Sequence, residues 1–119
     1  MEDIFRRTLL FDFYGDLLTK HQRSMYEAVV LNDTGFSEAA QEAGISRQGV
    51  HDMIRRCDRQ METYEEKLGL MEKFLKIRKL TEEIDGLAAA LQKDREMNEP
   101  AAEGLERIRC LCRDIRDEL

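Results

Sequence analysis

Residues 42–56 read EAGISRQGVHDMIRR, a stretch in which turn-forming and apolar residues stand at fixed offsets. Gly44 supplies the positive φ that turns the chain after a helix, and Ser46 can cap the helix that follows. Small or aliphatic residues stand where the two helices would touch: Ala40, Ile45, Val50 and Ile54. This spacing predicts a helix-turn-helix with a short first helix over about 36–43 and a second helix that begins at Arg47. An ordinary helical hairpin with a glycine turn is the alternative.

The second helix of this motif has an inner and an outer face. Four apolar residues at helical spacing form the inner face: Val50, Ile54, Cys57 and Met61. The helical repeat then directs six polar residues outward or to the flank: Arg47, Gln48, Asp52, Arg55, Arg56 and Arg59. Glutamine matches an adenine edge, and arginine matches phosphate or guanine. Two interpretations stay open, a contact with nucleic acid or a solvated face with salt bridges within the helix.

Asp52 lies in the middle of the outer face. It repels backbone phosphates unless it pairs with Arg55 or Arg56, or accepts from a cytosine amino group. Two further candidates for phosphate contacts, Lys20 and Arg23, stand at the start of an earlier helix. The candidate nucleic-acid-binding residues are therefore Lys20, Arg23, Arg47, Gln48, Asp52, Arg55, Arg56 and Arg59.

The overall charge argues against a protein that binds nucleic acid over its whole surface. The chain has a formal net charge of -6 and a pI near 5.0. Residues 1–59 contain eight basic and ten acidic side chains, a net charge of -2, whereas residues 60–119 contain eleven and fifteen, a net charge of -4. Most of the negative charge thus lies outside the motif, and a locally basic face stays compatible with binding.

The apolar periodicity along the chain predicts an all-α protein without strands. A first helix is expected over residues 3–18. One stripe of it contains Leu10, Tyr14 and Leu17. Thr19 and Gln22 have the spacing of a capping box, in which each side chain bonds the other residue's backbone amide, so a second helix begins there. The turn residues at 32–35 end that helix.

The C-terminal half predicts long helices with apolar stripes. Helix is expected to run from the motif to Asn98–Pro100 with one interruption near Gly69, and a last helix covers about 101–118. We expect a helix-turn-helix bundle over 1–60 and a long helical extension over 61–119. The stripes are too long for so small a core to cover, so the extension should form a helical hairpin or pair between subunits of a homodimer.

No pattern of a catalytic, metal or cofactor site is found in the sequence. His21 and His51 have no cysteine or carboxylate at ligand or triad spacing, and no phosphate-binding loop or nucleophile elbow is found. The three cysteines lack metal-ligand spacing and fit reduced thiols. No apolar run reaches bilayer length, and the charged first residues do not fit a signal peptide. We therefore expect a cytosolic protein that is not an enzyme and uses no cofactor.

Three sequence blocks resemble the YlxM-like helix-turn-helix proteins of Gram-positive bacteria, a family associated with the signal recognition particle pathway. The first comprises LFDFY at 10–14, LLTK at 17–20 and QR at 22–23; the second SRQ at 46–48, Val50, Asp52 and IRR at 54–56; the third YEEKL at 64–68 and Leu70. Together they cover about residues 4–80. The motif itself also resembles region 4 of bacterial RNA polymerase sigma factors, which is a less specific match.

The resemblance implies a small, all-helical regulatory protein encoded beside the particle's GTPase and receptor, with no catalytic residues. It implies that the outer face of the second motif helix is the functional surface. Three functions remain to be weighed. The first is an accessory regulator of the particle that binds structured RNA or a protein component; the second is a dimeric, DNA-binding transcription regulator; the third is an interaction scaffold.

Overall fold

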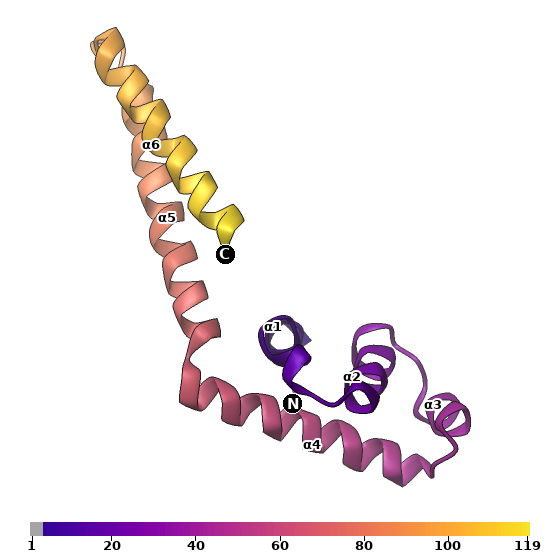
Figure 1. Ribbon diagram of the computed structural model, residues 1–119. Helices are drawn as coiled ribbons and strands as arrows, with labels where there is room; N and C mark the ends of the chain where they lie inside the picture. Colours follow the sequence, from indigo (N-terminus) through magenta and orange to yellow (C-terminus); the bar gives the residue numbers. More distant parts are fainter. Residues whose placement is uncertain (1–3) are drawn as a thin grey trace. The chain divides into compact units, whose positions relative to one another are not determined.

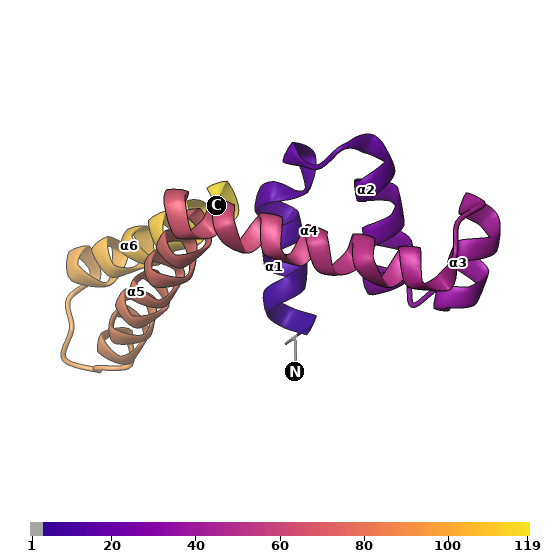
Figure 2. The same ribbon diagram turned by 90° about the horizontal axis from the view of Figure 1, so that it is seen from below.

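The computed structural model describes residues 4–119 and contains six α-helices and no strand within that range (Figures 1 and 2). The helices are α1 (Ile4–Tyr14), α2 (Lys20–Tyr26), α3 (Phe36–Ala43), α4 (Arg47–Leu68), α5 (Leu70–Gln92) and α6 (Glu99–Glu118). A short 3-10 segment, η1 (Gly15–Leu17), follows α1, and a π-helical segment, η2 (Glu27–Leu31), continues α2. The all-α prediction is confirmed.

The chain forms two compact units, and the boundary in the sequence lies between Met71 and Glu72. In the first unit, α1, α2 and α3 pack along one side of α4 (Figures 1 and 2). Its core consists mainly of apolar side chains from these four helices and from the segments on either side of α2: Leu10, Tyr14, Leu18, Met25, Tyr26, Val29, Ala39, Ala40, Val50, Ile54, Cys57 and Met61. The predicted inner face of the second motif helix is therefore the face of α4 that the bundle buries.

The helix-turn-helix is built as the sequence predicts. Gly44 ends α3 with a φ of 69°, and the Ile45 amide donates to the Ala40 carbonyl at 3.1 Å. The Ser46 hydroxyl then accepts from the Gly49 amide at 2.9 Å, so that α4 starts at Arg47. Because these local bonds satisfy backbone groups at both helix ends, the direction of the chain at the turn is fixed by residues within the motif.

The first helix ends earlier than predicted. It was expected to continue to residue 18, but α1 stops at Tyr14, and Gly15 opens the 3-10 segment. Leu17, predicted to lie on the apolar stripe, is therefore 53% exposed, and Leu18 is buried in its place. The predicted start at residue 3 lies outside the described residues. The capping box is confirmed, because the Gln22 amide donates to the Thr19 hydroxyl and the Thr19 amide to the Gln22 side chain.

A carboxylate joins the end of α4 to the start of α5. Gly69 ends α4 with a φ of 64°, which confirms the predicted interruption. Glu65 Oε1 accepts from the Tyr14 hydroxyl at 2.6 Å and from the Met71 amide at 2.8 Å, while the Leu70 amide donates to the Tyr14 oxygen at 3.2 Å. Because these groups pack against α1, the first unit extends to Met71, beyond the boundary at residue 60 expected from the sequence.

A second polar cluster joins α1, α2 and α4. The Asp58 carboxylate accepts from Arg7 Nη2 at 2.9 Å and from the Tyr26 hydroxyl at 2.6 Å. The Arg7 guanidinium also lies over the Tyr26 ring, whose other stacking partner is Phe11. The Arg7 and Asp58 side chains are only 19% and 15% exposed, so each charge depends on the other for stabilisation. Burial and the bond to Asp58 raise the pKa of Tyr26.

The second unit is a helical hairpin, in which α5 and α6 run antiparallel (Figure 1). Asp85 accepts from Arg109 Nε at 2.9 Å, and Gln92 bonds both Arg109 and Glu106 at 3.0 Å. The Arg109 guanidinium lowers the pKa of Asp85. The buried residues of this unit are Thr81, Ala88 and Cys112, all with small side chains. On α6, Cys112 rather than its neighbour Leu111 therefore occupies the inner position.

The connection between the hairpin helices differs from the prediction. Helix was expected up to Asn98, but α5 ends at Gln92, because the Asp94 carboxylate accepts from the Glu96 amide at 3.0 Å and forms a local turn. The last helix begins at Glu99 rather than 101, since the Asn98 side chain caps it by accepting from the Ala101 amide.

We predict that Tyr14→Phe lowers the free energy of unfolding of the first unit by about 1–3 kcal/mol, because Glu65 loses a buried hydrogen-bond donor. Urea denaturation followed by circular dichroism measures the change. Tyr64→Phe is the matched control. Within residues 4–119, the Tyr64 hydroxyl accepts from the Gln60 side chain at the half-buried surface of α4, so its loss should cost less than about 1 kcal/mol. Equal losses in the two variants would contradict this role of Tyr14.

We also predict that Cys57 resists alkylation in the folded protein. Its side chain is fully buried, and burial raises the pKa of its thiol to about 11. Since the thiolate is the reactive form, only about 0.1% of Cys57 would be ionised at pH 8 even if reagent could enter. Iodoacetamide followed by mass spectrometry of peptides should modify the half-buried Cys110 first, and Cys57 only in urea. Modification of both at the same rate without urea would show that the core opens.

Candidate nucleic-acid interface

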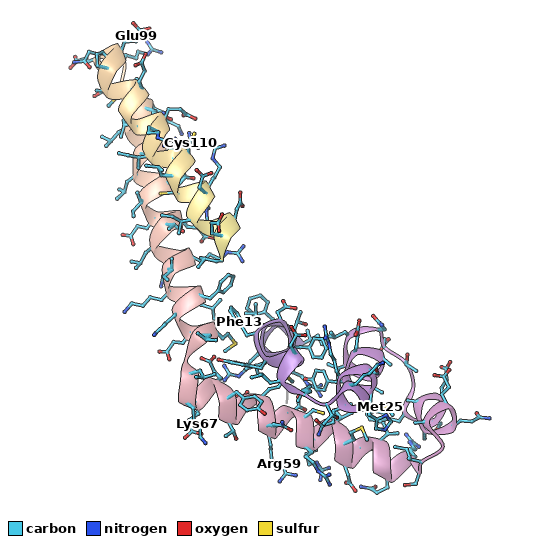
Figure 3. The ribbon with its side chains drawn as sticks, in the orientation of Figure 1. Phe13, Met25, Arg59, Lys67, Glu99 and Cys110 are labelled. Atoms are coloured by element: carbon cyan, nitrogen blue, oxygen red, sulfur yellow. The ribbon has the colours of Figure 1, made fainter. Side chains whose placement is uncertain are left out.

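The outer face of α4 lies on the side of this helix opposite the bundle. Arg47, Gln48, Asp52, Arg55, Arg56 and Arg59 are all exposed. Figure 3 shows Arg59 on the side of α4 that faces away from α1 and α2, whereas Met25 lies between α2 and α4. We call these six residues the α4 outer face. One helix therefore brings together six of the eight candidate residues, and Val50, Ile54, Cys57 and Met61 hold that helix from behind.

The arginines of the α4 outer face are free of carboxylate partners. No acidic side chain among residues 4–119 forms an ion pair with Arg47, Arg55, Arg56 or Arg59. Asp52 does not pair with an arginine; it accepts from Gln48 Nε2 at 3.0 Å, one turn earlier. The described structure thus contains no salt bridges within the α4 outer face, which was the alternative interpretation of these residues. Four exposed guanidinium groups remain available to a ligand.

The net charge of this part of α4 is positive. Residues 47–59 contain four arginines and two aspartates, which gives +2. Asp58 points to the bundle and its charge is compensated by Arg7, so Asp52 is the carboxylate that directly reduces the charge of the outer face. Beyond Arg59 the helix becomes acidic, with Glu62, Glu65 and Glu66. The basic part is thus confined to the first three turns or so after the motif turn.

The two remaining candidates, Lys20 and Arg23, lie on α2. Arg23 Nη1 is 2.6 Å from Asp16 Oδ1, and both side chains are at least half exposed. An exposed ion pair of this kind contributes little to stability, but it offsets the charge that Arg23 would offer a phosphate. Lys20 is exposed at the first residue of α2. The structure therefore separates these two residues from the α4 outer face and weakens the case for Arg23.

A groove beside the outer face was missed by the sequence analysis. It has a volume of about 320 Å³ and is lined by Arg7, Phe36, His51, Ile54, Arg55, Asp58 and Arg59. The Phe36 and His51 rings stack at one side of it, with centroids 3.9 Å apart and planes within 5°. Arg55 and Arg59 thus contribute to both the groove and the outer face. No local pattern could have revealed it, because Arg7 and Phe36 approach α4 only in the folded bundle.

The helix before the turn has the opposite charge. Glu38 and Glu42 are exposed on α3, where no basic residue is present. Carboxylates at this position repel the phosphates that would flank a ligand bound to α4. The attractive field is therefore restricted to α4 itself. Because salt screens charges that are more than about 10 Å apart, the arginines attract a ligand only once it lies within this distance.

Within residues 4–119, no group of three or more histidine, cysteine, aspartate or glutamate side chains is placed to hold a metal ion. None of the helices described for this chain is both long and apolar enough to cross a membrane.

Comparisons with known proteins agree with the motif. A family model described as "Putative helix-turn-helix protein, YlxM / p13 like" matches residues 1–100, which include the α4 outer face and the whole of α5.

Similar proteins occur in several bacteria. The UPF0122 protein of Caldanaerobacter subterraneus subsp. tengcongensis is 48% identical over 85 residues, which cover 71% of this chain and 73% of the relative. The UPF0122 protein of Listeria innocua is 39% identical over 104 residues, with 87% and 92% covered. That of Bacillus velezensis is 38% identical over 108 residues, with 91% and 97% covered. The chain therefore belongs to the UPF0122 family of YlxM/p13-like helix-turn-helix proteins.

Proposed function

We propose that this protein is a regulatory accessory protein of the signal recognition particle pathway that binds structured RNA through the α4 outer face. The pathway is suggested by the family resemblance of the three sequence blocks, and the contact with nucleic acid by the helix-turn-helix. In this proposal Arg47, Arg55, Arg56 and Arg59 hold phosphates or guanine edges. The expected homodimer is a separate proposal, which rests on the C-terminal hairpin and not on this face.

The observation that carries the proposal is the absence of carboxylate partners around the four arginines of α4 within the described chain. On an acidic protein with many ion pairs, arginines without such partners on one helix face are available for an anionic ligand. Arginine binds phosphate in a planar, two-bonded geometry and stacks on bases, which suits folded RNA. The groove with the stacked Phe36 and His51 offers an aromatic edge beside these arginines.

Duplex DNA is the second candidate ligand. Arg47 and Gln48 open α4 directly after a capped turn, and recognition helices contact base edges from this position. Glu38 and Glu42 on α3 argue against DNA, because a duplex that holds α4 in its major groove would bring its phosphates towards the preceding helix. RNA loops and bulges can approach α4 without passing α3, and for this reason we favour RNA.

We predict that the double variant Arg55→Ala, Arg59→Ala binds signal recognition particle RNA about 10- to 100-fold more weakly than the unchanged protein at 0.1 M salt. The slope of log K against log salt should also become shallower by about 1.4 to 1.8, because two phosphate contacts are lost. Fluorescence anisotropy with labelled RNA over a salt series measures both quantities. The double variant Lys93→Ala, Arg95→Ala is the control. Both residues are exposed in the loop after α5, and the two substitutions remove the same amount of positive charge as Arg55→Ala, Arg59→Ala.

Parallel titrations with random duplex DNA and with the particle's GTPase complete this test. Tighter binding of duplex DNA than of the RNA would favour the transcription regulator. Binding to the GTPase alone, unaffected by the arginine substitutions, would favour the interaction scaffold. If the arginine and control variants lose affinity equally, the α4 outer face is not the contact.

We also predict that Asp52→Asn strengthens RNA binding by about 3- to 10-fold, because it removes the carboxylate that reduces the charge of the outer face. Gln48 keeps an acceptor at position 52, so the helix should remain equally stable. The same anisotropy assay measures the gain, and Asp94→Asn, in the loop after α5, is the control for net charge. Weaker binding of Asp52→Asn would mean instead that this carboxylate accepts a hydrogen bond from the ligand.

A further inference from the structure

The second unit has an apolar face that its own two helices do not cover. Nine large aliphatic side chains are between 38% and 62% exposed: Ile77, Leu80, Ile84, Leu87 and Leu91 on α5, and Ile108, Leu111, Ile115 and Leu119 on α6. We call this set the hairpin face. On α5 its members follow one another at intervals of three and four residues, the repeat of a helix that packs along its length against others.

The exposed aliphatic residues of α5 form one stripe and those of α6 a second, and both stripes lie on the same side of the hairpin. In both helices the exposed aliphatic residue comes one position before a buried one: Leu87 precedes Ala88, and Leu111 precedes Cys112. Each stripe is therefore rotated in the same sense from the line along which the helices touch. For antiparallel helices, equal rotations point to one side of the layer. The nine side chains thus form one continuous surface rather than two surfaces on opposite sides.

The interior of the hairpin is too small to support it alone. Within residues 72–119, only Thr81, Ala88 and Cys112 are buried, and none of them has a large apolar side chain. Two helices bury one line of contact, whereas a stable helical domain needs a second layer over its apolar face. The hairpin face, which carries the large aliphatic residues, is where that layer has to lie.

The size and chemistry of the hairpin face fit a second copy of the same surface. With about 180 Å² for a fully exposed leucine or isoleucine, the exposed fractions amount to roughly 700 Å², close to the ~800 Å² per partner of a stable interface. Isoleucine at 77 and 84 alternates with leucine at 80 and 87, as in self-associating helices.

The edges of the face are also self-complementary in charge. The residue before each of four isoleucines is charged and exposed: Lys76, Glu83, Arg107 and Asp114. Each helix thus contributes one basic and one acidic edge residue. A partner of single-signed charge would be repelled by half of them, whereas a copy related by a two-fold axis presents both signs in return.

From these observations we propose that the hairpin face is a homodimer interface, in which α5 and α6 of two copies form a four-helix bundle. The dimer supplies the second layer that the hairpin lacks. This inference is independent of nucleic-acid binding, since it involves only residues of the second unit.

Sedimentation velocity of the purified 119-residue chain, from about 1 to 100 µM and without nucleic acid, tests the proposal. We expect a mass of about twice the 13.9 kDa of one chain. Leu87→Glu should raise the dissociation constant at least about 100-fold, because the two-fold axis places two carboxylates in one interface. Leu87 is 62% exposed within its own chain, so the substitution should leave the hairpin helices intact. Circular dichroism at high concentration checks the helix content.

Lys79→Gln is the matched control. It makes the same change in net charge on the same helix, at an exposed position outside the hairpin face, and should remain a dimer. Leu111→Glu on α6 should dissociate the chain as Leu87→Glu does. An unchanged protein that stays at the mass of one chain at about 100 µM would overturn the proposal. So would a dimer that persists in both glutamate variants, because another surface would then hold it together.

Discussion

Asp58 is the residue through which three helices of the first unit are held together. Its carboxylate lies on α4 and is bound by Arg7 of α1 and by Tyr26 of α2. A carboxylate so little exposed is stable only with its partners in place, so the cluster permits one arrangement of the three helices much better than others. Arg59 follows Asp58 directly in sequence, and the helical repeat turns it about 100° away from Asp58, where it is exposed. The contacts that fix the bundle therefore also fix which arginines face solvent.

The motif could be predicted from the sequence because its determinants are local. Gly44, Ser46 and the capping pair Thr19–Gln22 act through bonds to residues at most a few positions away, and each is found where the spacing requires it. The inner face of α4 was predictable for a related reason, since helical periodicity alone separates it from the polar side. Six of the eight candidate residues lie on the resulting outer face.

Features that depend on distant residues could not be predicted in this way. Nothing in the local sequence distinguishes Glu65 from Glu66, yet Glu65 is buried and accepts from the Tyr14 hydroxyl and the Met71 amide. The groove beside α4 needs Arg7 and Phe36, and the pairing of Arg23 needs Asp16 beyond the end of α1. Leu17 was misplaced because a 3-10 turn replaces the last turn of the expected helix.

An acidic chain can carry a basic helix face because its positive and negative charges lie on different helices. The arginines without carboxylate partners are concentrated on α4, whereas α3 carries exposed glutamates. A field of this kind is short-ranged in physiological salt. It does little to attract an anionic partner from a distance and acts mainly once that partner is in place, which favours a ligand of fitting shape over nucleic acid in general.

The hydrogen bond between Gln48 and Asp52 has a consequence for selectivity. The Gln48 amide nitrogen donates one of its two N–H groups to Asp52 at 3.0 Å, which orients the amide and leaves its second N–H and its oxygen for a ligand. A ligand bound to this oriented amide lies beside the carboxylate, which accepts from a hydrogen-bond donor on the ligand and repels an acceptor. Gln48 and Asp52 would then select two neighbouring groups of the ligand together. A change in the group bound by one residue would alter which group is accepted by the other.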